Sequence, residues 1–246
     1  MPRANRIIQP NCIYHLTQRC HNRAFLFKFS AERDRYQRHL REKLQEHGIP
    51  LLNYCITSNH VHLLVVAESR GQLANFMKET QGEYAQAYNR RTQRSGAFWG
   101  DRYHATMVEE GMYLARCMRY IDLNMIRAGV VDDPRAWKWT GYAELMGEKK
   151  RNRLIDFSEV LRRSGHSQRE SFQIYYAAGL AELIEQGNAR QAEWTECLAV
   201  GSKNYVEYIE SRLTERSRFV RQVSVFDATR WTLKEPIFGY RAASRG

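Results

Sequence analysis

The chain has 246 residues, which allows one large domain, or one domain of average size with an extension. A hydrophobic share of 43% with only five prolines excludes a largely disordered chain, and no stretch is apolar for the length that a membrane span needs. The formal net charge of +11 favours a polyanionic partner, with nucleic acid ahead of an anionic membrane surface, although a basic surface can also serve solubility alone.

The first part of the chain predicts a strand, a helix and two further strands. Side chains alternate over residues 13–18, as is typical of a strand, and Ser30 can cap a helix that Gly48 ends. Apolar runs at 51–56 and 60–67 predict the second and third strands, joined by a tight connection.

A helix, a strand and one more helix follow. We expect a second helix over about 71–91, a fourth strand over 103–108 and an uninterrupted third helix over 111–129. This order predicts an α+β fold of the ferredoxin-like (split βαβ) type, an antiparallel sheet with crossover helices and one additional helix. The two crossover helices would cover one face of the sheet and leave the other face for a ligand.

A charged run over residues 148–153 marks a predicted boundary. We therefore expect a domain over 1–147 and a small helical C-terminal extension over 148–246, whose role the sequence does not indicate. Helical periodicity in this extension covers 157–161, 172–184 and 205–213. The last 30 residues are basic and mixed in pattern, and no role is assigned to them.

His60 and His62 lie two residues apart on the third predicted strand. Side chains of a strand alternate between its faces, so both imidazoles project from the same side and can share one metal ion. Two core histidines satisfied by hydrogen bonds are the alternative interpretation of this triplet.

The third predicted helix carries a polar ridge beside its apolar stripe. Tyr120 and Asn124 are four residues apart and therefore lie one above the other on neighbouring turns. Arg116 and Arg127 belong to the same ridge, which could lie over the two histidines. A phenol, an amide oxygen and two guanidinium groups can together support phosphoryl transfer to tyrosine. The alternative is a half-buried tyrosine with ordinary solvated charges around it.

Four groups of residues, in this order and spacing, resemble a known family over roughly residues 6–142. They are Tyr14-His15-Leu16-Thr17 with Arg19, Asn22 and Arg23; Ser58-Asn59-His60-Val61-His62-Leu63-Leu64; Phe98-Trp99 with Arg102-Tyr103; and Tyr120-Ile121-Asp122-Leu123-Asn124 with Arg127-Ala128-Gly129. The chain resembles the REP-associated tyrosine transposases, within the single-tyrosine HUH transposases.

The resemblance implies a single-stranded DNA endonuclease and strand transferase that acts on hairpins of repetitive extragenic palindromes and needs Mg or Mn. His60 and His62 match the metal ligands of this family, and Tyr120 matches its nucleophile, which forms a 5′-phosphotyrosine intermediate. Asn124 stands where related insertion-sequence transposases carry a glutamine, and is the implied third metal ligand. The bound cation, with Arg116 or Arg127, would help to form the phenolate.

Six residues are candidates for DNA contacts, through charge or through base stacking. They are Arg19, Arg23, Arg102, Tyr103, Arg116 and Arg127. Aromatic residues beside a strand can equally belong to the core, and Arg19 or Arg23 can simply be solvated.

Two other functions are considered. A ferredoxin-like nucleic-acid-binding regulator without chemistry would keep the basic surface. A metal-free two-histidine phosphoesterase is suggested by His15-Leu16-Thr17, but the second HxT or HxS that it needs is not supplied by His60-Val61-His62. The absence of an apolar leader and of CxxC spacing among five cysteines leads us to expect a bacterial cytoplasmic protein, nucleoid-associated when bound to DNA and without a membrane partner. The sequence leaves open whether the protein is a monomer or a homodimer, whether the tyrosine helix serves its own subunit or a neighbouring one, which DNA sequence is the target, and whether the genetic element still moves.

Overall fold

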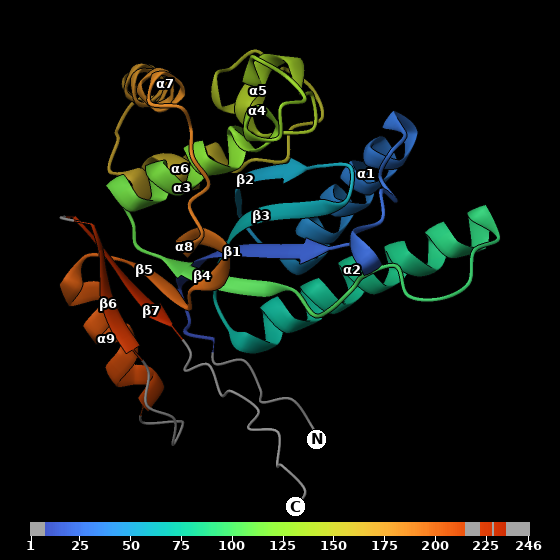
Figure 1. Ribbon diagram of the computed structural model, residues 1–246, viewed down its shortest axis with the longest axis horizontal. Coiled ribbons are helices and arrows are strands. Elements are labelled where there is room, and N and C mark those ends of the chain that lie inside the picture. Colours follow the sequence, from blue (N-terminus) through green and yellow to red (C-terminus); the bar gives the residue numbers. More distant parts are fainter. Residues whose placement is uncertain (1–7, 215–221, 228, 235–246) are drawn as a thin grey trace, which may run out of the picture.

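A seven-stranded sheet in the order β2-β3-β1-β4-β5-β7-β6 forms the centre of the computed structural model (Figure 1). The structure describes residues 8–214, 222–227 and 229–234. The strands in these ranges are β1 (Cys12–Arg19), β2 (Leu51–Ile56), β3 (His60–Ala67), β4 (His104–Val108), β5 (Ala199–Gly201), β6 (Gln222–Asp227) and β7 (Arg230–Lys234).

Helices cover both faces of the first four strands. α1 and α2 pack together on one face, and α3 packs on the other face, where it contacts β2 (Figure 1). The helices are α1 (Ser30–His47), α2 (Arg70–Thr92), α3 (Met112–Asp122), α4 (Asn124–Arg127), α5 (Tyr142–Leu145), α6 (Phe157–Ser164), α7 (Arg169–Glu185), α8 (Glu193–Glu196) and α9 (Lys203–Thr214), with short 3-10 turns η1 (His21–Arg23) and η2 (Pro134–Ala136).

The predicted ferredoxin-like arrangement is confirmed. β1 is central and pairs antiparallel with β3 on one side and β4 on the other, and β2 pairs antiparallel with β3. α1 ends as predicted at Gly48, whose φ of 59° is a left-handed conformation that glycine adopts without strain. The predicted cap is wrong by one residue, because Phe29 takes the N-cap position and Ser30 is already helical.

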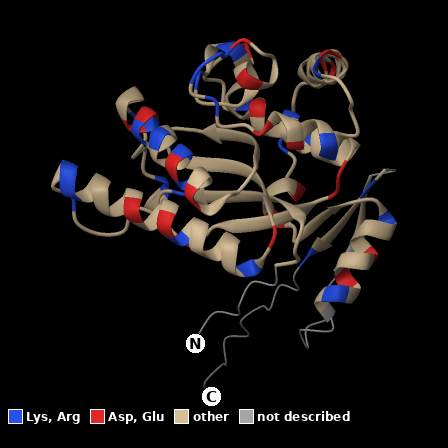
Figure 2. Ribbon diagram, turned by 180° about the vertical axis from the view of Figure 1, so that it is seen from behind, with Lys and Arg blue, Asp and Glu red and all other residues tan. Residues whose placement is uncertain are grey.

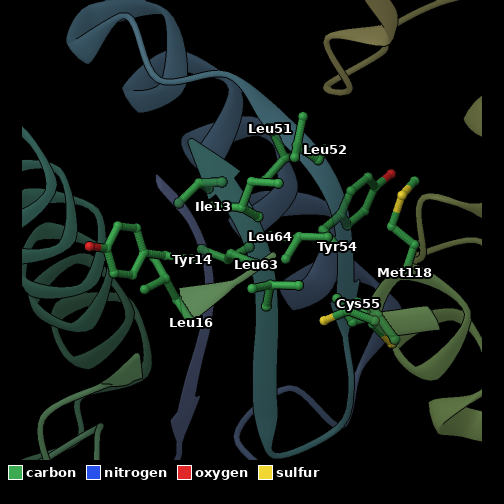
Figure 3. Packing of buried hydrophobic residues seen from close by; sticks show 14 of the residues in the cluster. Ile13, Tyr14, Leu16, Leu51, Leu52, Tyr54, Cys55, Leu63, Leu64 and Met118 are labelled. Carbon is green, nitrogen blue, oxygen red and sulfur yellow. The ribbon is translucent and has the colours of Figure 1, made fainter. Parts of the chain in front are cut away.

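The two central strands are apolar because both of their faces are covered. β3 is buried from Val61 to Ala67, and Figure 3 shows Leu63 and Leu64 among the packed side chains of the neighbouring strands. Tyr14 of β1 is equally buried and points away from β3 in the same view. Charged residues are spread over the surrounding helices and loops, while the central strands carry few of them (Figure 2).

The expected uninterrupted helix over 111–129 is divided at Leu123, where ψ is 4°. The amide of Asn188 donates a hydrogen bond to the Leu123 carbonyl (3.2 Å), a contact from a distant segment that local periodicity does not reveal. Backbone bonding continues across the break, since the Arg127 amide still donates to the Leu123 carbonyl at 2.9 Å. Residues 120 and 124 therefore stay on neighbouring turns.

The C-terminal extension contains the three predicted helices, as α6, α7 and α9, but it is not purely helical as expected. β5 pairs in parallel with β4, and the β6–β7 hairpin continues the sheet from β5. β5 has three residues, too few to show alternation, so its sequence carries no strand signal. Of the last 30 residues, to which the sequence assigns no role, the structure describes 222–227 and 229–234; the others lie outside the described residues, as do residues 1–7. No helix in the described ranges combines the length and apolar character of a membrane span.

Candidate active site

Strand register brings three histidines onto the sheet face that α3 covers. Thr17 of β1 pairs with His62 of β3, and His15 pairs with Leu64, so His15 projects on the same side as His60 and His62. The rings of His60 and His62 have centroids 4.9 Å apart, and those of His15 and His62 are stacked at 5.1 Å. The two predicted metal ligands therefore do share a face, and a third imidazole lies beside them.

His62 is held on both of its ring nitrogens. Its Nδ1 lies 2.9 Å from Nε2 of His15, and its Nε2 lies 3.1 Å from the amide nitrogen of Asn124. His62 is 2% exposed and His15 is fully buried. The third predicted ligand, Asn124, is thus in direct contact with the second.

His60 is oriented by the loop that precedes β3. Its Nδ1 lies 2.7 Å from Oδ1 of Asn59 and 2.8 Å from the hydroxyl of Thr57. The other end of the Asn59 amide donates to the Arg23 carbonyl, so Asn59 presents a carbonyl oxygen to the ring. Nδ1 of His60 consequently carries the proton, and its Nε2 lone pair is left for a ligand.

Tyr120 lies on α3 with its ring against this imidazole group. The ring centroid is 6.2 Å from that of His62 and also 6.2 Å from that of His15. The Arg127 guanidinium carbon lies 4.0 Å from the Tyr120 ring centroid, and the same side chain donates to the Tyr120 carbonyl at 2.7 Å. The indole of Trp194 lies on another side of the ring, with centroids 6.5 Å apart. One chain thus supplies the imidazole pair and the phenol.

Burial and nearby cations set the charge states of these groups. Desolvation, with additional repulsion from Arg19 and Arg127, lowers the pKa of His60 to about 3. Desolvation and the neighbouring imidazoles of His60 and His15 also lower the pKa of His62. For Tyr120, desolvation raises the pKa, and Arg127 opposes that shift. The imidazoles are therefore neutral, as metal ligands must be, and the phenol is protonated in the free protein.

The residues present fit a divalent cation. Two neutral imidazoles and an amide are suitable donors for Mn²⁺ or a related ion, and a phosphate oxygen would supply the hard ligand. The Asn124 amide now offers nitrogen to His62, and a half-turn of this group places its carbonyl oxygen at the same position.

The predicted DNA contacts divide into two sets. Arg19, exposed at the end of β1, interacts electrostatically with Tyr120 and Arg23, and Arg127 touches the Tyr120 ring. Arg116 instead donates to the Thr229 hydroxyl at 3.0 Å. Tyr103 and Arg102 belong with Arg116 to the second set: Tyr103 packs against the hydrophobic core, and Arg102 is exposed in the loop before β4. The structure thus places Arg19 and Arg127 near the phenol, with Arg23 close to Arg19, and places the other three residues elsewhere.

The sequence indicates no site role for Trp194, Asn188 or Arg190, and it suggests His15 only as part of the family motif and of a two-histidine phosphoesterase. Asn188 accepts a hydrogen bond from Arg127 at 3.1 Å. Arg190 lies close enough to Tyr120 to lower its pKa. Asn188 and Arg190 line a cavity of about 400 Å³ that Arg127 also borders. The alternation of β1 could have placed His15, because it is two residues from Thr17 on the same face. No local pattern marks the others, since their partners lie far away along the chain.

A different cluster of possible metal ligands lies on α1 and α2. Glu46, His47 and Glu79 come within ligand distance of one another. The Lys43 ammonium is 2.8 Å from Glu46 and 3.9 Å from Glu79, and Glu79 is also 2.8 Å from His47. Ion pairing with Lys43 accounts for this group of partly exposed side chains without a metal.

Comparisons with known proteins concern the family and the fold. Residues 8–124 match the family model described as IS200-like transposase. The structure of a REP-associated tyrosine transposase bound to a REP hairpin is similar, with a TM-score of 0.52 and 12% identity, covering 60% of this chain and 86% of that one. A candidate transposase from Deinococcus radiodurans R1 aligns with a TM-score of 0.34 and 20% identity over 42% of this chain and 83% of that one. No curated protein sequence matches the chain.

Proposed function

We propose, on the premise that residues 8–124 match the family model of the IS200-like transposases, that the chain is a metal-dependent single-stranded DNA endonuclease and strand transferase with Tyr120 as nucleophile. We propose DNA hairpins of the repetitive extragenic palindrome type as its substrates. The fold that this chain shares with a transposase solved on a REP hairpin supports that choice of substrate.

One observation carries the proposal: a single chain holds the Tyr120 ring 6.2 Å from the ring of His62, with His60 on the same face. If His60 and His62 were only core residues, the packing would require neither a tyrosine ring beside them nor an Nε2 atom of His60 that is left for a ligand. The combination of two neutral imidazoles, an adjacent amide and a phenol flanked by a guanidinium suits phosphoryl transfer.

The reaction proceeds by in-line attack of the Tyr120 oxygen on the scissile phosphorus. A divalent cation bound by His60, His62 and Asn124 would polarise a non-bridging phosphate oxygen. The phenol loses its proton to solvent, the bond from phosphorus to the 3′-oxygen breaks, and that oxygen takes up a proton. Arg127, against the Tyr120 ring, stabilises the phenolate. Attack by a DNA 3′-hydroxyl on the 5′-phosphotyrosine rejoins the strand and restores the phenol, so no nucleotide cofactor is consumed.

The test is a labelled single-stranded hairpin incubated with the protein and Mn²⁺ or Mg²⁺, followed by denaturing electrophoresis. We expect a covalent protein–DNA species that Tyr120→Phe lacks. Tyr113→Phe is the matched control, because Tyr113 lies on the same helix but its hydroxyl donates to the Thr229 carbonyl. This control should form the species normally.

His60→Ala and His62→Ala should abolish cleavage and leave salt-sensitive hairpin binding largely intact. A covalent species formed by Tyr120→Phe would contradict the assignment of the nucleophile, and unchanged cleavage in chelator would contradict the metal. Tight hairpin binding by the wild-type protein without any cleavage would favour the non-catalytic regulator instead.

A further inference from the structure

We infer that the segment 188–197, which lies beyond the family match, completes the active site by fixing His62 in its metal-binding tautomer, with His15 as the positioning residue that connects them. The connection is a chain of two hydrogen bonds from the Trp194 carbonyl through His15 to His62. The metal in this inference rests on the proposed function, whereas the two hydrogen bonds do not depend on it.

The Trp194 carbonyl determines which atoms donate and which accept in these two hydrogen bonds. Nδ1 of His15 lies 2.8 Å from the backbone carbonyl oxygen of Trp194. A carbonyl oxygen can only accept, so Nδ1 of His15 must carry a proton. In a neutral imidazole the other nitrogen, Nε2, is then an acceptor.

The direction at His15 determines the tautomer of His62. Nε2 of His15 lies 2.9 Å from Nδ1 of His62, and since Nε2 accepts, Nδ1 of His62 donates. The alternative requires a charged imidazolium at His15, which is fully buried and has no carboxylate beside it among its described contacts. Nε2 of His62 is therefore the unprotonated atom, and it faces Asn124. Metal-binding histidines are typically oriented by such a bond from the opposite ring nitrogen.

The Trp194 carbonyl is a firmly placed anchor. The Trp194 side chain is fully buried, and its indole nitrogen donates to Gln191 at 2.7 Å. On the sheet, the Thr106 hydroxyl lies 3.1 Å from the Trp194 carbonyl and 2.7 Å from that of Cys197, and His104 lies 3.0 Å from the Cys197 carbonyl. Side chains of β1 and β4 thus bind the Trp194 carbonyl of α8 and the carbonyl of Cys197, the residue after α8, directly to the sheet.

The same segment positions the nucleophile. Asn188 accepts a hydrogen bond from Arg127 and donates one to the Leu123 carbonyl, so it ties the guanidinium to the turn between α3 and α4. The Trp194 ring lies beside the ring of Tyr120. The imidazole that binds metal and the phenol that attacks phosphate are therefore both placed by residues 188–197.

The test is the tautomer of His62 in the metal-free protein, measured by NMR of ¹⁵N-labelled imidazoles. We expect His62 to be protonated at Nδ1 and bare at Nε2. In His15→Leu, which removes the acceptor, we expect the Nε2-protonated form to appear. His15→Gln places a carbonyl oxygen near the original Nε2 position and should restore the wild-type pattern.

Thr106→Val is the matched control. It removes the hydroxyl that lies 3.1 Å from the Trp194 carbonyl with almost no change of volume, and should leave the His62 tautomer unaltered because Nδ1 of His15 still donates to that carbonyl. Thermal unfolding identifies which variants are folded. If His15→Leu does not fold, the wild-type tautomer and the pair His15→Gln and Thr106→Val still decide the question.

Mn²⁺ affinity, measured by calorimetry without DNA, gives the second readout. Loss of such a supporting partner typically weakens metal binding by about 10–100-fold, which we expect for His15→Leu but not for Thr106→Val. A wild-type His62 protonated at Nε2, or a folded His15→Leu with unchanged tautomer and Mn²⁺ affinity, would overturn the inference. If the wild-type tautomer is as expected but Mn²⁺ does not bind, the metal step of the proposed function fails and the hydrogen-bond chain stands.

Discussion

Two buried imidazoles, His15 and His62, and the partly buried imidazole of His60 lie on one sheet face and give this protein an unusual response to acid. The pKa of His60 and that of His15 are lowered to about 3, chiefly by desolvation, and that of His62 is lowered as well. An exposed histidine titrates near pH 6.5, so between roughly pH 6.5 and 3 the unfolded chain binds more protons than the folded protein. Stability must therefore fall as the pH falls through this window.

Asp122 acts in the opposite direction. Desolvation raises the pKa of its fully buried carboxyl to about 6, despite hydrogen bonds from Thr140 and Tyr176 that lower it. This group favours the folded state at low pH and loses that contribution as the pH rises through about 6. Because three imidazoles lower the stability in acid and one carboxyl raises it, the net effect of a lower pH is to destabilise the folded protein.

We predict that the metal-free protein has a lower free energy of unfolding at pH 5 than at pH 7, measured by urea unfolding in chelator. A single imidazole with such a shift contributes about 1–2 kcal/mol to this difference. His60→Asn should reduce the difference by a similar amount. Equal stability at the two pH values in both proteins would show that the histidines are not desolvated as described.

Arg127 and Arg116 make different contacts, so we expect their replacement to have different effects. Arg127 lies against the Tyr120 ring, whereas Arg116 donates to Thr229. We predict that Arg127→Met slows covalent adduct formation by about 10–100-fold, because the phenolate loses its nearest cation. Arg116→Met should slow it much less, in single-turnover assays with saturating hairpin. Equal losses would remove the special role of Arg127.

At the scale of elements, the position of α3 depends on how it is tied to β2. The buried Asn53 side chain of β2 donates to the Met118 carbonyl of α3 at 3.0 Å. Gly141 packs directly on the Asn53 amide, where a Cβ would lie 2.0 Å from its oxygen. Tyr120 is two residues from Met118, so this contact helps to hold the nucleophile over the sheet.

We predict that Gly141→Ala destabilises the protein by about 1–3 kcal/mol, because Asn53 must leave its place. Gly82→Ala is the control: this glycine lies within α2, has nothing within 4 Å of an added Cβ, and its replacement should stabilise by about 0.5–1 kcal/mol. Thermal or urea unfolding measures both. A neutral Gly141→Ala would mean that the α3–β2 contact adapts easily.

The strands and α-helices from β1 to α3 could be predicted from sequence because each shows alternation, an apolar run or helical periodicity of its own, whereas the division between α3 and α4 could not. The same periodicities placed His60 with His62 and Tyr120 with Asn124. The contact of His15 with Trp194 spans 179 positions and joins a strand to a four-residue helix, so neither local pattern nor spacing could reveal it. β5 was missed for the same reason, since three residues pair only because β4 is already in place.

At the scale of the whole molecule, the two parts of the chain share one sheet. β5 continues the sheet from β4, and α8 covers the face that carries the histidines. Arginines reach the phenol from both parts, since Arg19 and Arg127 precede the expected boundary and Arg190 follows it. The cationic surroundings of Tyr120 thus depend on the complete fold.

This arrangement predicts salt-sensitive binding of single-stranded hairpins. In fluorescence anisotropy titrations, Arg19→Ala and Arg23→Ala should each reduce the slope of log K against log salt by about 0.7, the value for one phosphate contact on a single strand. Arg162→Ala is the control, because this exposed arginine on α6 is paired with Glu159. Identical slopes for all three variants and the wild type would place the DNA elsewhere.

The residue to which the DNA becomes covalently attached identifies the nucleophile directly. Protein incubated with hairpin and Mn²⁺ is digested with protease and nuclease, and the peptides are sequenced by mass spectrometry. We expect a nucleotide 5′-phosphate on the oxygen of Tyr120. A nucleotide on any other residue, or a cleaved hairpin with no modified peptide, would contradict it.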